Sequence, residues 1–81
     1  MNDQREVIVA LHNLDTAHKI EMLIADAGYR VLAVCNSGND LIRKTMSLDP
    51  EIIIIGYKLT DMTILDIYDA LSDKCSFLAI V

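Results

Sequence analysis

Four short runs of β-branched and other apolar residues recur along this chain of 81 residues, and they restrict its possible folds more than any other feature. The runs cover residues 7–11, 31–35, 52–55 and 77–81. Continuous apolar runs of this length are typical of strands that are buried on both faces of a sheet. The third run consists of four consecutive isoleucines, and we expect it to form a central strand.

Segments with helical periodicity lie between these runs. Asn13 or Asp15 is expected to cap the first helix, and Gly28 follows it where a left-handed residue is common. Asp61 or Thr63 is expected to cap the third helix. Apolar side chains at helical spacing predict the buried faces, which are Ala17, Ile20, Leu23, Ile24 and Ala27 in the first helix, Leu41, Ile42, Thr45 and Met46 in the second, and Ile64, Leu65, Tyr68 and Leu71 in the third.

The order of these elements is β-α-β-α-β-α-β. Strands that alternate with helices predict a three-layer α/β fold with a parallel sheet and right-handed crossovers. The length permits one small domain, residues 1–81. The last run has no turn or helix after it, which would leave an open sheet edge and a poorly covered face. We therefore expect either that more chain follows in the natural protein, the simpler explanation, or that a second copy covers this edge.

Composition and charge argue against several classes of function. The chain has 12 acidic and 7 basic residues, for a net charge of −5, which disfavours binding to nucleic acid or to an anionic membrane through bulk charge. No apolar run approaches the ~18 residues that a membrane-spanning helix needs. The N-terminus is polar and lacks the pattern of a secretory signal, so we expect a cytoplasmic protein.

The two cysteines, Cys35 and Cys75, are too few for a disulfide framework or a zinc motif. We expect both to be reduced and to lie at opposite ends of the sheet, beyond the ~7 Å Cα separation that a disulfide allows. His12 should lie beside Cys35, but the spacing matches no metal motif, and nothing supplies an oxyanion hole. We expect a partly buried, hydrogen-bonded His12, with no metal and no cofactor.

The order and spacing of the elements resemble the receiver domain of bacterial two-component response regulators. The resemblance is carried by the segment from Val7 to Gly28 and Tyr29, by residues 31–35 and by residues 49–55, and it extends over the whole chain. It implies an incomplete flavodoxin-like (CheY-like) sheet of strand order 2-1-3-4, ending within the fourth strand, and ligand chemistry at the carboxyl ends of strands 1 and 3. Residues 1–81 would then be a partial receiver-like domain.

The carboxylates of the receiver reaction are missing from the matching positions. Receivers hold Mg²⁺ with an acidic pair after the first strand and phosphorylate an aspartate after the third, because a hard cation and a transferred phosphoryl group need oxygen ligands. The resemblance places the acidic pair at Leu11 and His12 and the acceptor at Gly56. It therefore implies a non-enzymatic pseudo-receiver with no catalytic residue, and we interpret the nearest acids, Asp15 and Asp61, as helix caps.

Two other functions stay open. One is a small-ligand module that uses the crevice at the ends of strands 1 and 3, around His12, Asn13, Gly56, Tyr57 and Lys58, although we expect Tyr57 to pack over the vacant acidic site. The other is an active receiver that uses a displaced acid such as Asp61.

The partner that the sequence favours is a protein, either a different protein or a second copy bound through the open fourth strand, with the third helix beside it. The resemblance implies a role in signal transduction or transcription regulation, with an output domain downstream. The spacing from Gly28 to Val31 is compatible with the antiterminator (ANTAR) subgroup of regulators.

Overall fold

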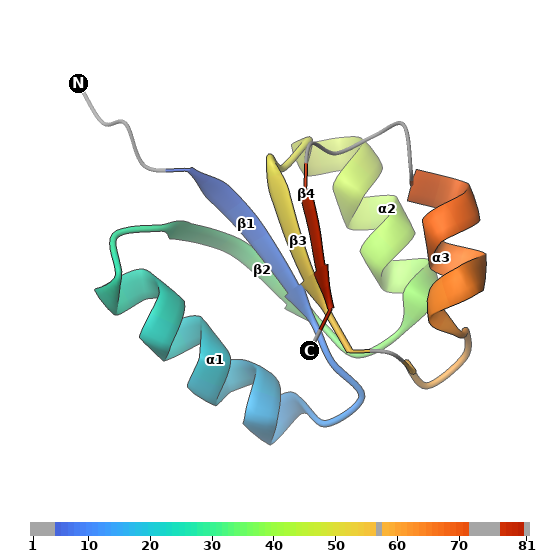
Figure 1. Cartoon of the computed structure of the whole chain (residues 1–81), viewed down its shortest axis with the longest axis horizontal. Helices are drawn as coiled ribbons and strands as arrows, with labels where there is room; N and C mark the ends of the chain where they lie inside the picture. Colours follow the sequence, from blue (N-terminus) through green and yellow to red (C-terminus); the bar gives the residue numbers. More distant parts are fainter. Residues whose placement is uncertain (1–4, 57, 72–76, 81) are drawn as a thin grey trace.

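The structure is a computed structural model that describes residues 5–56, 58–71 and 77–80, the last four by their backbone. Strands and helices alternate as the sequence predicts (Figure 1). The elements are β1 (Glu6–Ala10), α1 (Leu14–Asp26), β2 (Arg30–Cys35), α2 (Gly38–Leu48), β3 (Ile52–Ile55), α3 (Ile64–Leu71) and β4 (Phe77–Ile80).

The four strands form one parallel sheet of order β2-β1-β3-β4, which confirms the predicted strand order. Val9 of β1 pairs with Val34 of β2 and with Ile54 of β3, so β1 has a neighbour on each side. The backbone N–H of Leu11 donates to the Cys35 carbonyl at 3.1 Å. The N–H of Gly56 donates to the Ala10 carbonyl at 2.9 Å, so the ends of β1 and β3 are held side by side.

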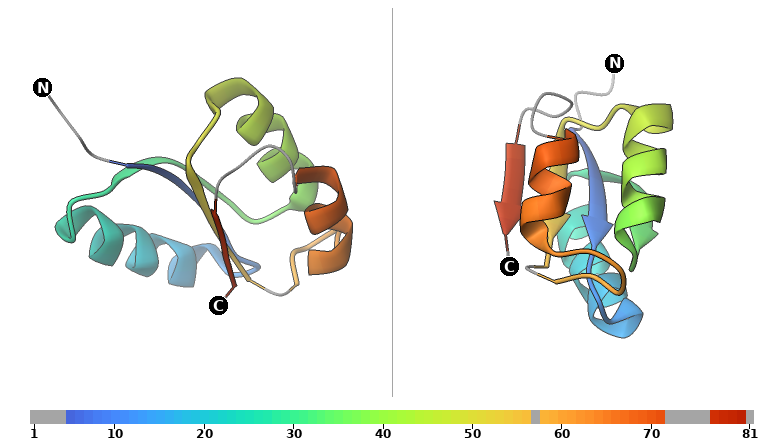
Figure 2. Two further views of the ribbon diagram at one scale, coloured as in Figure 1. Left: turned by 45° about the horizontal axis from the view of Figure 1, so that its top comes forward. Right: turned by 90° about the vertical axis from the view of Figure 1, so that its right-hand side faces the viewer.

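Helices cover the two faces of the sheet unequally (Figure 2). Helices α2 and α3 pack on one face, where the buried cluster comprises Ile8, Ala10, Cys35, Leu41, Ile53, Ile55, Leu59, Ile67 and Leu71. Helix α1 lies on the other face, mainly over β2 and β1. The cluster there has Val7, Val9, Leu11 and Ala17 buried, with Ile20, Ile24, Val31, Val34, Ile52 and Ile54 only partly buried. The poorly covered face that the sequence predicts is the α1 face over β3.

Short polar side chains fix where the helices begin. Asn13 caps α1, and its Oδ1 accepts from the N–H groups of Asp15 and Thr16 at 2.8 and 3.2 Å. Thr63 precedes α3, and both its N–H and its hydroxyl donate to the Asp66 carboxylate. The Asp66 carboxylate thus satisfies an N–H group at the start of α3. Gly28 follows α1 with φ of 101°, the left-handed conformation that favours glycine.

Several predicted positions were wrong in detail. Asp15 lies in the first turn of α1 instead of capping it, because the preceding Asn13 reaches the free N–H groups first. Asp61 caps α2 and not α3. Some side chains of the predicted buried faces are exposed, because they lie outside the contact between helix and sheet. They are Leu23, Ala27, Met46, Leu65 and Tyr68.

Candidate functional site

An apolar contact occupies the ends of the two central strands. Leu11 directly follows β1 and is 7% exposed, and Gly56 directly follows β3 and is buried. A Cβ atom added to Gly56 would lie 3.0 Å from Cδ2 of Leu11. The leucine side chain therefore fills the space into which a side chain at position 56 would extend. The two neighbouring strand ends thus place a leucine side chain beside a glycine, and neither residue has a side-chain oxygen.

The loop after β3 adds an apolar side chain to the core on the α2 and α3 face. Leu59 is buried within the cluster on the α2 and α3 face, and its N–H donates to the Met62 carbonyl at 3.0 Å. Sequence reasoning assigned no role to Leu59, although an apolar residue inside an otherwise polar loop was a visible signal. With Leu59 turned inward, the loop packs as part of the core.

The same loop is fastened to the start of α2. The carboxylate of Asp61 accepts from the backbone N–H groups of Gly38 and Asn39 at 2.5 and 3.1 Å. The N–H and the hydroxyl of Thr60 both donate to the Asn36 carbonyl, at 3.1 and 3.0 Å. We call these contacts between residues 60–62 and 36–39 the loop clasp.

The loop clasp sets both the packing and the charge of Asp61. A Cβ atom on Gly38 would lie 2.5 Å from Sδ of Met62, so the glycine allows the loop to approach the helix closely. The Gly38 N–H, and then that of Asn39, lower the pKa of the Asp61 carboxyl, because they stabilise its charged form at a helix N-terminus. Both carboxylate oxygens of Asp61 are thus engaged in positioning a helix.

The described residues of the predicted ligand crevice differ in their surroundings. His12 is exposed and not partly buried, because the chain turns away from the sheet after Leu11. The side chain of Asn13 is engaged in capping α1. Lys58 is exposed, and Tyr57 lies outside the described residues, so its predicted packing over the site stays a prediction.

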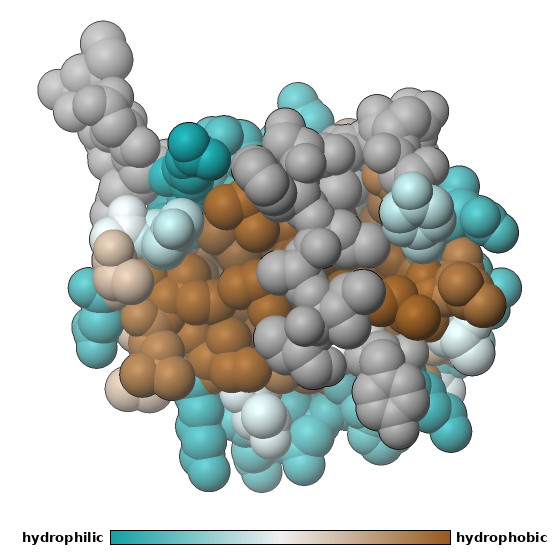
Figure 3. Space-filling model, in the orientation of Figure 1, coloured by the Kyte–Doolittle hydropathy of each residue, from teal (hydrophilic) through white to brown (hydrophobic). Residues whose placement is uncertain are grey.

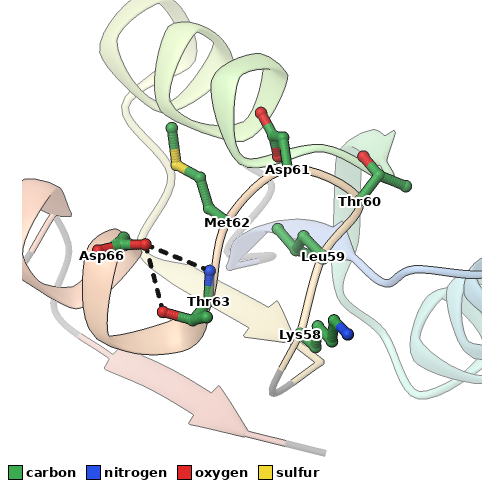
Figure 4. A pocket seen from close by; sticks show the side chains of 7 residues that line it. All are labelled: Lys58, Leu59, Thr60, Asp61, Met62, Thr63 and Asp66. Carbon is green, nitrogen blue, oxygen red and sulfur yellow. Dashed lines mark hydrogen bonds between the residues drawn. The ribbon is translucent and has the colours of Figure 1, made fainter.

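Lys58 does lie at a shallow pocket of about 240 Å³ formed by the β3–α3 loop (Figure 4). Its other lining residues are Leu59, Thr60, Asp61, Met62, Thr63 and Asp66. In the close view, Asp61 points toward the first turn of α2, and Lys58 extends from the other side of the loop. The carboxylates of Asp61 and Asp66 already accept hydrogen bonds from N–H groups of the protein. The two carboxylates of this pocket are thus used within the fold.

Cys35 is buried at the end of β2, and its surroundings favour the protonated thiol. Burial, reinforced by the nearby Asp40 carboxylate, raises the pKa of its thiol to about 11, so the thiol stays protonated near neutral pH. Within residues 5–56, 58–71 and 77–80, no three His, Cys, Asp or Glu side chains gather in a group that could hold a metal ion. Cys75 lies outside the described residues, and so does its predicted distance from Cys35.

The strand order, the parallel pairing and the helices on both faces define a receiver-like fold, the fold of response regulators, which confirms the resemblance seen in the sequence. Two solved structures of the regulator PhyR share this fold. One is the response regulator PhyR from Brucella abortus, with a TM-score of 0.86 and 14% identity over 98% of this chain and 33% of that one. The other is the anti-anti-sigma factor PhyR from Bartonella quintana, with a TM-score of 0.85 and 15% identity over 95% of this chain and 32% of that one.

The present chain spans about a third of the length of each PhyR structure. At this sequence identity, the likeness establishes the fold alone. No protein-family model and no curated protein sequence matches the chain. Among the described helices, none combines the length and the apolar character needed to cross a membrane.

Proposed function

We propose that this chain is a non-catalytic pseudo-receiver module of a bacterial signal-transduction or transcription regulator, and that it acts by protein–protein contact without phosphorylation at Gly56. The observation that carries the proposal is the packing of Leu11 against Gly56 where β1 and β3 end. In this interpretation, Leu11, His12 and Gly56 are the degenerate positions of a phosphorylation site.

The chemistry at these strand ends supports the proposal. Phosphoryl transfer requires an oxygen nucleophile, and Mg²⁺ that is held by oxygen ligands. Leu11 and Gly56 offer neither, and the buried Leu59 in the following loop adds no polar group. The displaced-acid alternative is disfavoured because the oxygens of Asp61 accept from Gly38 and Asn39 in the loop clasp.

The solved neighbours support a signalling role, because they are described as a response regulator and as an anti-anti-sigma factor. We extend this role to the present chain as part of the proposal, with a protein as the partner and the cytoplasm as the location. The antiterminator subgroup stays a prediction from the spacing of residues 28–31.

Incubation with acetyl phosphate and Mg²⁺, followed by intact-mass measurement, tests the proposal. We expect no phosphoryl adduct on this chain, while a receiver that carries all three carboxylates becomes phosphorylated in the same tube. A stoichiometric adduct would overturn the proposal. If Asp61→Asn then abolished that adduct and the exposed Asp69→Asn did not, the displaced-acid receiver would be the correct function.

A further inference from the structure

The start of α2 depends on a residue that lies far along the chain. The first N–H groups of a helix have no partner within it, and in α1 the local cap accepts from two of them. In α2 the side chain of the local cap, Ser37, accepts from the N–H of Asp40 at 3.1 Å. The N–H groups of Gly38 and Asn39 donate instead to Asp61 of the β3–α3 loop. The first turn of α2 therefore loses two hydrogen bonds when the loop moves away.

The first residue of α2 makes this turn weak by itself. It is a glycine, one of the poorest helix formers. The loop clasp nevertheless requires Gly38, because a Cβ atom there would lie between 2.5 and 2.9 Å from three atoms of the Met62 side chain. The close approach of the loop and the weak helix start thus come from the same residue.

The loop depends on the start of α2 in return. Three consecutive loop residues contact the segment 36–39. Thr60 donates to this segment through its N–H and its hydroxyl, Asp61 accepts from it twice, and Met62 packs against it. Because neighbouring residues of one chain cannot leave a surface independently, we expect these contacts to break together.

Residues 60–62 can separate from α2 without unfolding the core. They lie between Leu59, which is buried, and Thr63, which directly precedes α3. The side chains of Thr60 and Asp61 are exposed. Figure 3 shows apolar surface gathered over the sheet, whereas hydrophilic residues line the lower edge of the molecule, where this loop lies in Figure 1. Hydrogen bonds exposed to water open at a lower free energy than the whole fold.

From this geometry we propose that the loop clasp is a conformational latch. Residues 60–62 and the first turn of α2, residues 38–41, open and close as one unit while the sheet stays folded. The two segments then share a single opening equilibrium. A change that shifts this equilibrium from one segment shifts it in the other by the same factor.

The latch gives the proposed module a means of regulation, and this role rests on the proposed function. A protein that contacts the loop pocket beside Lys58 favours one state of the latch and so changes the first turn of α2 as well. The latch itself does not involve the ends of β1 and β3. It is therefore tested without a phosphoryl donor, and its failure would leave the result of the phosphorylation test unchanged.

Amide hydrogen exchange of the 81-residue chain, followed residue by residue by NMR, tests the latch. Two reporter amides donate to backbone carbonyls and not to Asp61, namely those of Leu59 in the loop and Leu41 in α2. The acceptor of Leu59 is the Met62 carbonyl, which leaves when the latch opens. The N–H of Ala17 is the reference, because it makes the equivalent first-turn bond in α1.

A matched pair of cap deletions perturbs one helix at a time. Ser37→Ala removes the side-chain cap of α2, and we expect exchange at both Leu41 and Leu59 to become about fivefold faster. Exchange at Ala17 should stay unchanged. Asn13→Ala removes the corresponding cap of α1 and should speed exchange at Ala17 alone.

The reciprocal change starts from the loop. Thr60→Val removes the hydroxyl that donates to the Asn36 carbonyl and keeps the shape of the side chain. We expect exchange at Leu41, on the helix side, to become about fivefold faster, again with Ala17 unchanged.

Two results would overturn the latch. If Ser37→Ala speeds exchange at Leu41 but not at Leu59, the loop closes independently of the helix. If Ala17 accelerates equally, these amides exchange only through unfolding of the whole chain. Circular dichroism checks folding, and if Ser37→Ala is unfolded, acceleration of Leu41 without Ala17 in Thr60→Val decides the question.

Discussion

The two faces of β3 carry the same residue in different surroundings. Ile53 and Ile55 point toward α2 and α3 and are 0% exposed, whereas Ile52 and Ile54 point toward the α1 face and are only partly buried. The four side chains are identical, so the difference comes from the layer above them. An apolar run predicts a strand suited to burial on both faces, but it does not say which element of which molecule completes the burial.

A similar contrast exists between the carboxyl ends of the central strands and the α1 face of the sheet. At the carboxyl ends of the strands, where a receiver would carry its chemistry, the Leu11 side chain fills the space in front of Gly56. On the α1 face, where a receiver-like sheet needs only packing, the surface beside Ile54 is open. Leu11 and Gly56 therefore bring no side-chain oxygen to the ends of β1 and β3, whereas Ile52 and Ile54 keep part of their apolar surface exposed on the α1 face.

Substitution of the isoleucines on the two faces should produce the largest difference in stability. Ile53→Ala removes a fully buried side chain, and we expect it to lower the free energy of unfolding by about 3–4 kcal/mol. Ile54→Ala should cost about 1–2 kcal/mol, because part of that side chain already contacts water. Urea denaturation at low protein concentration measures both as monomers. Equal costs would mean that the α1 face is covered as well as the other.

A double-mutant cycle tests whether the strand ends are packed as tightly as the covered face. Gly56→Ala should destabilise the chain by about 1–3 kcal/mol, because the new methyl group meets Leu11, while the backbone of Gly56 has no positive φ. In a Leu11→Ala background, Gly56→Ala should lower the free energy of unfolding only slightly. The two substitutions should therefore show a clear coupling energy. Additive costs in the two backgrounds would contradict the packing of Leu11 on Gly56.

Disruption of the loop clasp on the α2 side should lower the stability by a smaller amount, and this loss should depend on pH. Hydrogen bonds from Gly38 and Asn39 lower the pKa of Asp61 in the folded state, so its stabilisation is present above the ordinary aspartate pKa. This stabilisation is lost as the pH falls through the lowered value. Wild type should therefore exceed Asp61→Asn in stability at neutral pH and converge with it in acid. The exposed Asp69→Asn is the control, and a constant gap between wild type and Asp61→Asn would contradict the clasp.

Added ligands are expected to have the smallest effect, which would be measured as a change in the melting temperature. The loop pocket beside Lys58 has its carboxylates hydrogen-bonded within the fold. Nucleotides or divalent cations should therefore leave the melting temperature unchanged. A dose-dependent rise with either one would favour the ligand-module alternative.

Local patterns in the sequence predicted the elements, and contacts between distant residues account for most errors. Asn13 and Gly28 act within a few residues of a helix end, so their roles could be predicted. Asp61 caps a helix that begins 23 residues earlier in the chain, a partner that sequence spacing does not reveal. Leu23 fits the helical period of a buried stripe, but its exposure depends on which strands α1 covers.

The strand order came from the resemblance and was confirmed by the pairing of β1 with β2 and β3. The absence of carboxylates at Leu11 and Gly56 could be recognised from the sequence, since it follows from residue identity. That Leu11 fills the space in front of Gly56 could not, because this depends on the register of two strands and on a side-chain conformation.

The most direct test of the central claim is an NMR titration of the chain with Mg²⁺ and then with beryllofluoride, a mimic of the phosphoryl group. The account predicts that the amide resonances of Leu11, His12 and Gly56 do not move, because the strand ends offer no oxygen ligand and no acceptor. A saturable shift at these amides would show a working cation and phosphoryl site and would contradict the pseudo-receiver.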